Sequence, residues 1–117
     1  MKKIVFCTLR VVGFHSWPNA PEEYAYLRAS HRHEFHVRVE VPVQHNERDV
    51  EFIALKCQTY HLLSSLGSAS RYGGRDFGAR SCETLAEQLR VLLQGHGIEA
   101  SRIEVSEDGE NGAVLEW

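Results

Sequence analysis

Two long stretches near the N-terminus alternate hydrophobic and polar residues, which is the pattern of a β-strand with one buried face. They cover residues 3–15 and 31–43. The first ends in a histidine on its apolar parity, and the second begins with two histidines on its apolar parity. The positions that face the core are Val5, Cys7, Leu9, Val11, Gly13 and His15, then His31, His33, Phe35, Val37, Val39 and Val41. Because consecutive strands usually pair, we expect these two to be antiparallel neighbours.

Two later segments place apolar residues at helical spacing. Residues 48–67 predict one helix, with Asp49 as its N-terminal cap. The broad apolar face of this helix consists of Phe52, Ile53, Leu55, Tyr60, Leu62 and Leu63. The second predicted helix begins at Ser81, a hydroxyl cap, and ends near Gln94, just before a glycine.

The last part of the chain predicts two more strands. Residues 101–107 and 113–117 are rich in β-branched and apolar residues, and the turn-rich segment "DGENG" joins them. The element order is therefore strand, strand, helix, helix, strand, strand. Strands at both ends with helices between them predict one α+β domain over residues 1–117.

Two segments read as loops. Residues 16–30 carry two prolines in their first half, and residues 67–80 are rich in glycine and arginine. Arginine side chains and glycine backbone N–H groups together suit the binding of a phosphate. A solvent-exposed, flexible loop explains the same composition, so both interpretations of residues 67–80 stay open.

Composition narrows the class of protein. The 117 residues are 43% hydrophobic and 25% charged, which is ordinary for a globular domain. A net charge of −3 and a pI near 6.1 argue against nucleic acid or an anionic membrane as the main partner. No apolar run reaches membrane-spanning length. The three cysteines, Cys7, Cys57 and Cys82, lack the spacing of a metal site and fit a reducing, cytoplasmic setting.

The histidines are the candidate chemistry. His31 and His33 are two apart on one strand, so their imidazoles share a face, and His15 ends the neighbouring strand. Three neutral imidazoles can bind one ion and leave a fourth position open for water or substrate, as in a catalytic zinc site. Iron, nickel and copper also accept imidazole. The competing interpretation is that a surface strand carries histidines without any function.

Four histidines remain, and of these His61 lies in a predicted helix, where packing is its expected role. The other three also favour roles away from a metal. His36 points to the opposite face of its strand, and His45 and His96 lie in predicted turns. We therefore assign these three to solvent or to hydrogen bonds rather than to a metal. His15, His31 and His33 remain as the candidate ligands.

Five segments in order resemble the family of 6-pyruvoyl-tetrahydropterin synthase and 6-carboxytetrahydropterin synthase. They are "GFHSW", "LRASHRHEFHVRVEV", "VEFIALK", "SCETLAEQL" and "IEVSED". The resemblance implies the T-fold, a four-stranded antiparallel sheet with two helices on one face. It also implies zinc bound by His15, His31 and His33. Glu107 matches the glutamate with which the family grips the pterin, and a carboxylate suits two adjacent N–H donors.

The chain also departs from the family pattern. Leu27 stands where the family has its catalytic cysteine, and Arg32 replaces the glycine between the paired histidines. The family's Asp-His pair is not recognisable in this chain. A replacement acid or base must come from elsewhere, and Glu23 in the first loop is the residue we would test. Cys82 at a helix start is a further candidate, since that position can lower a thiol pKa.

These observations imply three competing functions. The first is a zinc-dependent lyase acting on a dihydropterin phosphate or a related pterin, with altered acid–base residues. The second is a non-catalytic T-fold protein that binds a pterin, purine or deazapurine through Glu107. The third is a structural remnant whose metal only stabilises an oligomer, which an open three-histidine site argues against. The resemblance further implies a homo-oligomer, by analogy a hexamer whose sheets join edge to edge.

Overall fold

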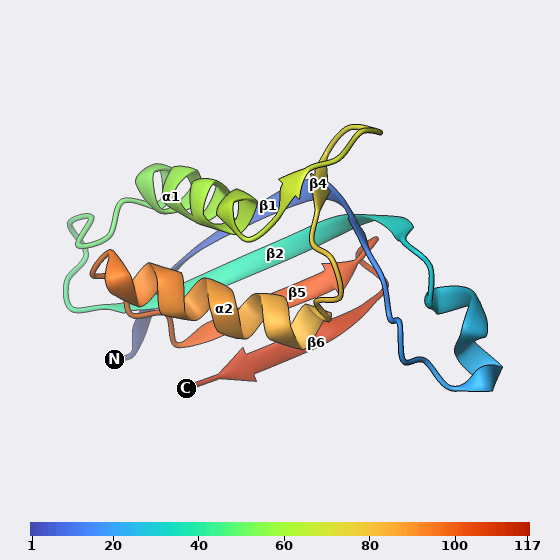
Figure 1. Ribbon diagram of the computed structural model, residues 1–117. Coiled ribbons are helices and arrows are strands. Elements are labelled where there is room, and N and C mark those ends of the chain that lie inside the picture. Colours follow the sequence, from blue (N-terminus) through green and yellow to red (C-terminus); the bar gives the residue numbers. More distant parts are fainter.

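The computed structural model describes all residues from 1 to 117 and shows an α+β fold. A twisted six-stranded sheet forms one layer, and two helices pack side by side on one of its faces (Figure 1). The strand order is β3-β4-β1-β2-β5-β6. The long elements are β1 (Lys3–His15), β2 (His31–Val43), α1 (Phe52–Ser65), α2 (Cys82–Gly95), β5 (Arg102–Glu107) and β6 (Asn111–Glu116).

The four long strands confirm the sequence prediction. β1 and β2 form an unbroken antiparallel ladder of 13 residues each, from Lys3 opposite Val43 to His15 opposite His31. β2 continues antiparallel to β5, and β5 to β6. Alternate residues of these strands point into the core beneath the helices, where Phe35, Val39, Ile103 and Val105 are at most 1% exposed. The period-two pattern thus identified both the strands and their buried face.

The expectation of a four-stranded, purely antiparallel sheet was wrong. Two short strands, β3 (Ser68–Ala69) and β4 (Arg75–Asp76), extend the sheet, and β4 runs parallel to the end of β1. They lie in the segment that the sequence presented as a glycine- and arginine-rich loop. A strand of two residues is too short to show any alternation, so the hydrophobic pattern carries no signal for it.

That segment is anchored rather than free. Phe77 is completely buried, and its N–H donates to the carbonyl of Phe14 at 2.8 Å. The guanidinium of Arg75 donates to the carbonyls of Ser64 and Gly67 at the end of α1. These contacts occupy Arg75 with the backbone, so it is not one of the arginines free to hold a phosphate.

The start of α1 also differs from the prediction. Glu51 caps the helix by accepting the N–H groups of Ile53 and Ala54, whereas Asp49 accepts the N–H of Gln44 in the preceding turn. Three residues of the predicted apolar face, Phe52, Ile53 and Tyr60, are exposed. The buried residues of the helix are Leu55, Thr59, Leu62 and Leu63. Ser81 caps α2 as predicted, through the N–H of Thr84.

Residues 16–30 form an arm that projects from the end of the molecule where β1 stops and β2 starts (Figure 1). A short 3₁₀ helix, η1 (Glu22–Leu27), lies at its far side. The arm is closed at its base by the N–H of Trp17, which donates to the carbonyl of Leu27 at 2.8 Å. This closure holds Trp17 and Leu27 near the last residue of β1, His15, and the first residue of β2, His31.

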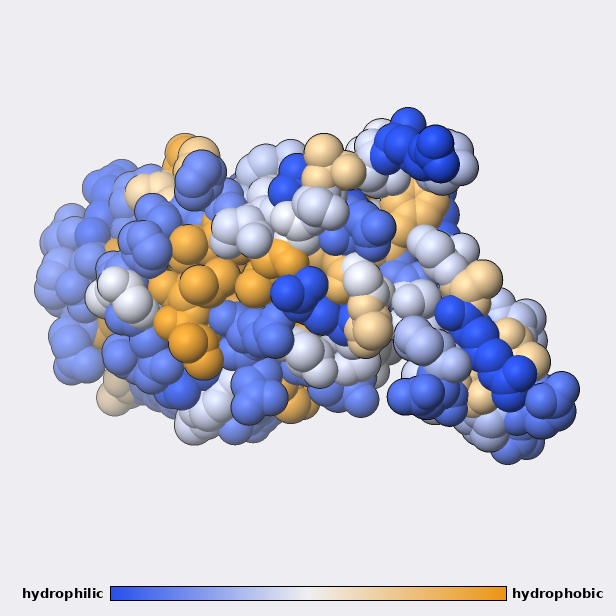
Figure 2. All heavy atoms as spheres, in the orientation of Figure 1, coloured by the Kyte–Doolittle hydropathy of each residue, from blue (hydrophilic) through white to orange (hydrophobic).

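Apolar and polar residues separate on the helical face of the molecule. Figure 2 shows hydrophobic residues gathered along the seam between α1 and α2, while the arm is predominantly hydrophilic. A shallow groove lies at that seam, lined by Leu66, Thr84, Glu87, Gln88, Val91 and Leu92. None of the helices has the length and apolar content that crossing a membrane requires.

Gly13 offers a test of the packing next to the histidines. A Cβ at Gly13 would lie 2.7 Å from the Phe77 ring and 3.0 Å from the Phe35 ring. Such overpacking typically costs about 1–3 kcal/mol, so we expect Gly13→Ala to lower the free energy of unfolding by that amount in urea titrations. Gly95→Ala is the control, because a Cβ there meets nothing within 4 Å and alanine favours the helix. Equal stabilities for the two variants would contradict the close packing.

Candidate metal centre

The three predicted ligands come together at one end of the sheet. The β1–β2 ladder pairs His15 with His31 directly and places His33 opposite Gly13. The ring centroids lie 4.6 Å apart for His15 and His31, 5.3 Å for His15 and His33, and 5.1 Å for His31 and His33. One nitrogen from each ring lies within 4.8 Å of the other two. This spacing suits a single metal ion, so the structure supports the predicted histidine cluster.

Hydrogen bonds orient all three rings in the same way. The Nδ1 atom lies 2.9 Å from the carbonyl of Arg80 in His15, and 3.0 Å from the carbonyl of Ala29 in His31. In His33 it lies 2.7 Å from a carboxylate oxygen of Asp108. Carbonyl and carboxylate oxygens only accept, so each Nδ1 must carry the proton. A neutral imidazole then has its lone pair on Nε2, which is the arrangement found in metal-binding histidines.

The buried Nε2 atoms are without a protein partner. Nε2 of His15 and of His33 are both buried and make no hydrogen bond. Oε2 of Glu107 approaches Nε2 of His33 to 2.8 Å without forming a hydrogen bond, and Oε1 lies 3.6 Å from Nε2 of His15, which is too far for one. Leaving buried polar atoms unpaired is costly. A divalent cation would satisfy both nitrogens and neutralise the carboxylate beside them, so the residues fit a metal.

Burial keeps the central ligand in the form that a metal needs. His15 is 6% exposed and packs edge-on against the ring of Phe35, with 5.0 Å between centroids. Loss of hydration lowers the pKa of His15, and the hydrogen bond to Arg80 offsets only part of that effect. The ring is therefore neutral at physiological pH, with its Nε2 lone pair available.

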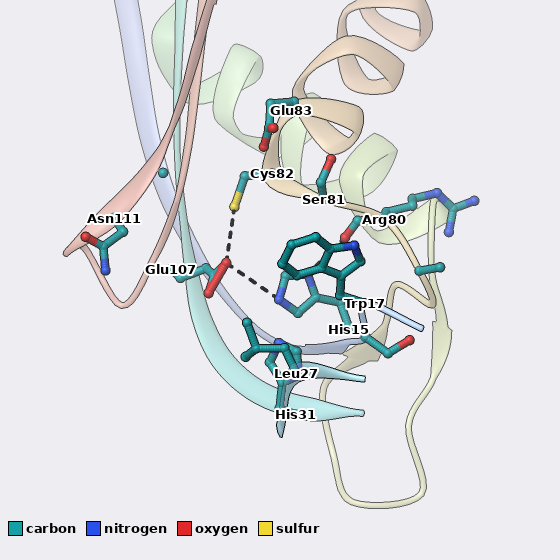
Figure 3. A pocket seen from close by; sticks show the side chains of 13 residues that line it. His15, Trp17, Leu27, His31, Arg80, Ser81, Cys82, Glu83, Glu107 and Asn111 are labelled. Carbon is teal, nitrogen blue, oxygen red and sulfur yellow. Dashed lines mark hydrogen bonds and ion pairs between the residues drawn. The ribbon is translucent and has the colours of Figure 1, made fainter. Parts of the chain in front are cut away.

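A cavity of about 490 Å³ opens next to the histidines (Figure 3). His15 and His31 line one side, and Glu107 lies across from them, at the end of β5. Trp17 and Leu27 of the arm form a further wall, so Leu27 borders the cavity at the position where the resemblance places a cysteine. A cavity of this size suits a small ligand with one or two rings.

The other candidate acid–base residues have different positions. Glu23 is exposed in η1 and does not line the cavity within this chain, so its catalytic role stays a prediction. Cys82 does line the cavity, and its Sγ lies 3.9 Å from Oε1 of Glu107. Burial, reinforced by the negative charge of Glu107, raises the pKa of Cys82 to about 12. The effect is opposite to the lowering expected at a helix start.

The three histidines assigned to hydrogen bonds lie outside the centre. His36 bonds Glu34 at 3.0 Å on the opposite face of the sheet. His45 accepts the N–H of Glu47, and His96 bonds the carbonyl of Leu92. Each therefore has a local partner in the structure.

Two residues of the site were not singled out from sequence. Trp17 stacks on Tyr24, with 6.0 Å between ring centroids and 24° between planes, and lines the cavity. Asp108 holds His33 although 75 positions separate them in the chain. Trp17 could have been found from its place two residues after His15. Nothing in the sequence marks Asp108, since its partner lies in a distant strand.

The sequence matches no protein-family model and no curated protein. Among solved structures, it is similar to the crystal structure of an uncharacterized protein from Wolinella succinogenes. The two chains share 12% sequence identity, with a TM-score of 0.56 over 99% of this chain and 98% of the other. At this identity the similarity concerns the fold alone, and it extends over both chains from end to end.

Metal content tests the centre directly. We expect the purified protein, loaded with zinc and desalted, to retain about one ion per chain, and His15→Ala and His33→Ala to retain little. His36→Ala is the matched control, because it removes a histidine from the same strand as His33 but from the opposite face. Elemental analysis of the three variants measures the outcome. Equal loss in the control, or no bound metal in the parent protein, would contradict the assignment.

Thiol labelling tests the surroundings of Cys82. We expect iodoacetamide to modify exposed Cys57 first and to leave buried Cys82 and Cys7 unmodified in the folded protein. Raising the pH of the solution from about 7 to about 9 should not increase the labelling of Cys82, because its pKa is raised to about 12 and the reactive thiolate does not form. Peptide mass spectrometry identifies the labelled sites, and labelling after unfolding is the control. Rapid modification of Cys82 near pH 7 would show a reactive thiolate instead.

Proposed function

We propose that this protein is a zinc-dependent T-fold protein of the 6-pyruvoyl-tetrahydropterin synthase type that acts on a dihydropterin phosphate or a related pterin. The observation that carries the proposal is the meeting of one nitrogen from each of the three histidines with the Glu107 carboxylate, beside a cavity that His15, His31 and Glu107 line. Metal ligands and an acceptor for ring N–H groups thus face the same space. The resemblance of the five sequence segments supports the same function.

His15, His31 and His33 would hold the zinc ion. Zinc suits a site of three neutral imidazoles, and when bound it supplies a Lewis acid that polarises an oxygen of the ligand. The chain itself excludes water from part of this site, because His15 is buried and packs edge-on against the rings of His31 and Phe35. The imidazoles are held in advance by their Nδ1 hydrogen bonds, so binding needs no rearrangement.

Glu107 and Trp17 would bind the ring system. The Glu107 side chain is about one-third exposed, and a carboxylate offers two acceptors for the adjacent N–H and amino donors of a pterin. Trp17 is half-exposed, and Tyr24 stacks with it within the arm. A flat indole wall favours a planar ligand. The cavity therefore combines a charged anchor, an aromatic wall and a metal position.

A second candidate function is binding without turnover, of a pterin, purine or deazapurine held by Glu107. Leu27 lines the cavity and cannot transfer a proton. The raised pKa of Cys82 likewise argues against a thiolate base. Of the carboxylates, only Glu83 and Glu107 line this cavity, which leaves Glu83 as the nearest alternative base within the chain.

Assembly into an oligomer would supply the missing acid or base from a neighbouring subunit. The outer edge of β6 and most of the outer edge of β1 have no strand beside them, and open edges favour pairing with another copy. We expect a homo-oligomer, a hexamer by analogy with the family, in the reducing cytoplasm. The arm that carries Glu23 projects from the body, so Glu23 would then act in a neighbouring subunit.

Ligand titration and turnover separate the two candidates. We expect the zinc-loaded protein to bind dihydroneopterin triphosphate with a change in tryptophan fluorescence, measured in a Trp117→Phe background so that Trp17 reports alone. Glu107→Gln should weaken binding at least ~10-fold, because the glutamine amide has one acceptor oxygen for the two N–H donors of the ligand, whereas the glutamate carboxylate has two. Product analysis by chromatography then decides between the enzyme and the binding protein.

Glu110→Gln is the control for this titration. It changes an exposed glutamate in the same β5–β6 connection without touching the cavity. Its affinity should equal that of the parent. If neither this compound nor a deazapurine binds the parent protein, the proposed ligand class is wrong even where the metal is present.

A further inference from the structure

Asp108 ties the turn after β5 to the start of β2. It follows Glu107 directly and adopts a left-handed backbone conformation, with φ of 57°. Its N–H donates to the carbonyl of Glu34 at 2.8 Å, and its Oδ1 accepts the N–H of Glu34, also at 2.8 Å. Its Oδ2 accepts the Nδ1–H of His33 at 2.7 Å. One side chain therefore fixes both a backbone position and a histidine ring.

We propose that Asp108 is a positioning residue that sets the tautomer, the orientation and the metal affinity of His33. The inference rests on the metal site of the proposed function and does not depend on which organic ligand binds. A carboxylate behind a metal-binding histidine makes the imidazole a stronger donor than a carbonyl does. Of the three histidines, only His33 has a carboxylate in that position.

The histidines thus have unequal support. Backbone carbonyls orient His15 and His31, and these cannot be removed by changing a side chain. His33 lies between two acids, with Glu107 2.8 Å from Nε2 and Asp108 2.7 Å from Nδ1. The two carboxylate charges would balance those of a divalent ion in the site. Among the ligands, His33 is therefore the one whose geometry depends on a replaceable charged partner.

The surroundings keep Asp108 in its accepting form. Both carboxylate oxygens accept a hydrogen bond, Oδ1 from the N–H of Glu34 and Oδ2 from the Nδ1–H of His33. An ionised carboxylate can only accept, so it admits only the His33 tautomer with the proton on Nδ1. This leaves Nε2 toward the other two histidines.

Asp108→Asn tests the role of the Asp108 carboxylate with the smallest change in side-chain shape. Asparagine tolerates the left-handed conformation as aspartate does, so the turn is preserved. The asparagine amide has only one acceptor oxygen, whereas the N–H of Glu34 and the Nδ1–H of His33 each need an acceptor. One of these two donors would then face the amide NH₂ group, which cannot accept a hydrogen bond. We expect zinc affinity to fall ~10- to 100-fold, measured by competition with a chromogenic chelator. Asp108→Glu restores the charge and should recover part of the loss.

Asp49→Asn is the matched control. Asp49 also accepts a backbone N–H, from Gln44 at 2.8 Å, and lies 3.6 Å from Nε2 of His45. The same chemical change beside a histidine is thus made far from the centre, and zinc affinity should stay that of the parent. Loss of affinity in Asp49→Asn, or parental affinity in Asp108→Asn, would overturn the inference.

A measurement on the parent protein covers the case in which Asp108→Asn fails to fold. Long-range ¹H–¹⁵N correlation spectra of the zinc-loaded protein report which nitrogen of each imidazole carries the proton. The inference requires His33 to bind zinc through Nε2 with a proton on Nδ1, and coordination through Nδ1 would refute it. Absence of zinc binding in the parent would refute the proposed metal site, whereas zinc binding without pterin binding would leave the role of Asp108 intact.

Discussion

The register of the β1–β2 ladder is the constraint on which the rest of the structure depends. A shift of one residue between paired strands moves every side chain of the shifted strand to the other face of the sheet. The observed register places Val11 opposite Phe35 in the core and, four pairs further on, His15 opposite His31. Phe35 is 1% exposed, so burying it fixes the same alignment that gathers the histidines. Core packing and the metal centre are therefore set by one choice of register.

The core also determines the chemistry at its end. The Phe35 ring packs edge-on against His15, His33 and Phe77, and Gly13 has no side chain to displace it. These apolar surroundings remove water from His15 and hold it neutral. The lone pairs then have no partner within the protein, which is costly unless a cation is bound. The stability of the core and the capacity to bind a metal are thus linked through the same aromatic residues.

Local patterns allowed much of the fold and the ligand set to be predicted, and distant partners account for what was missed. Alternation identified β1, β2, β5 and β6, and placed His15, His31 and His33 on the core-facing parity. The prediction of Asp49 as the helix cap was wrong, because Asp49 accepts the N–H of Gln44 and Glu51 caps the helix instead. The roles of Phe77, Asp108 and the carbonyl of Arg80 arise only from tertiary contacts.

The candidate metal ligands lie on a different kind of structure from Glu23, the candidate acid–base residue, and from Leu27, which stands at the position of the family's cysteine. The ligands lie on the long paired strands, where any change in position would disrupt a 13-residue ladder. Leu27 and Glu23 lie instead on an arm that meets the body mainly at its base. A residue on such an arm can be exchanged without altering the sheet. The sheet can therefore keep the three histidines together while the residues on the arm change.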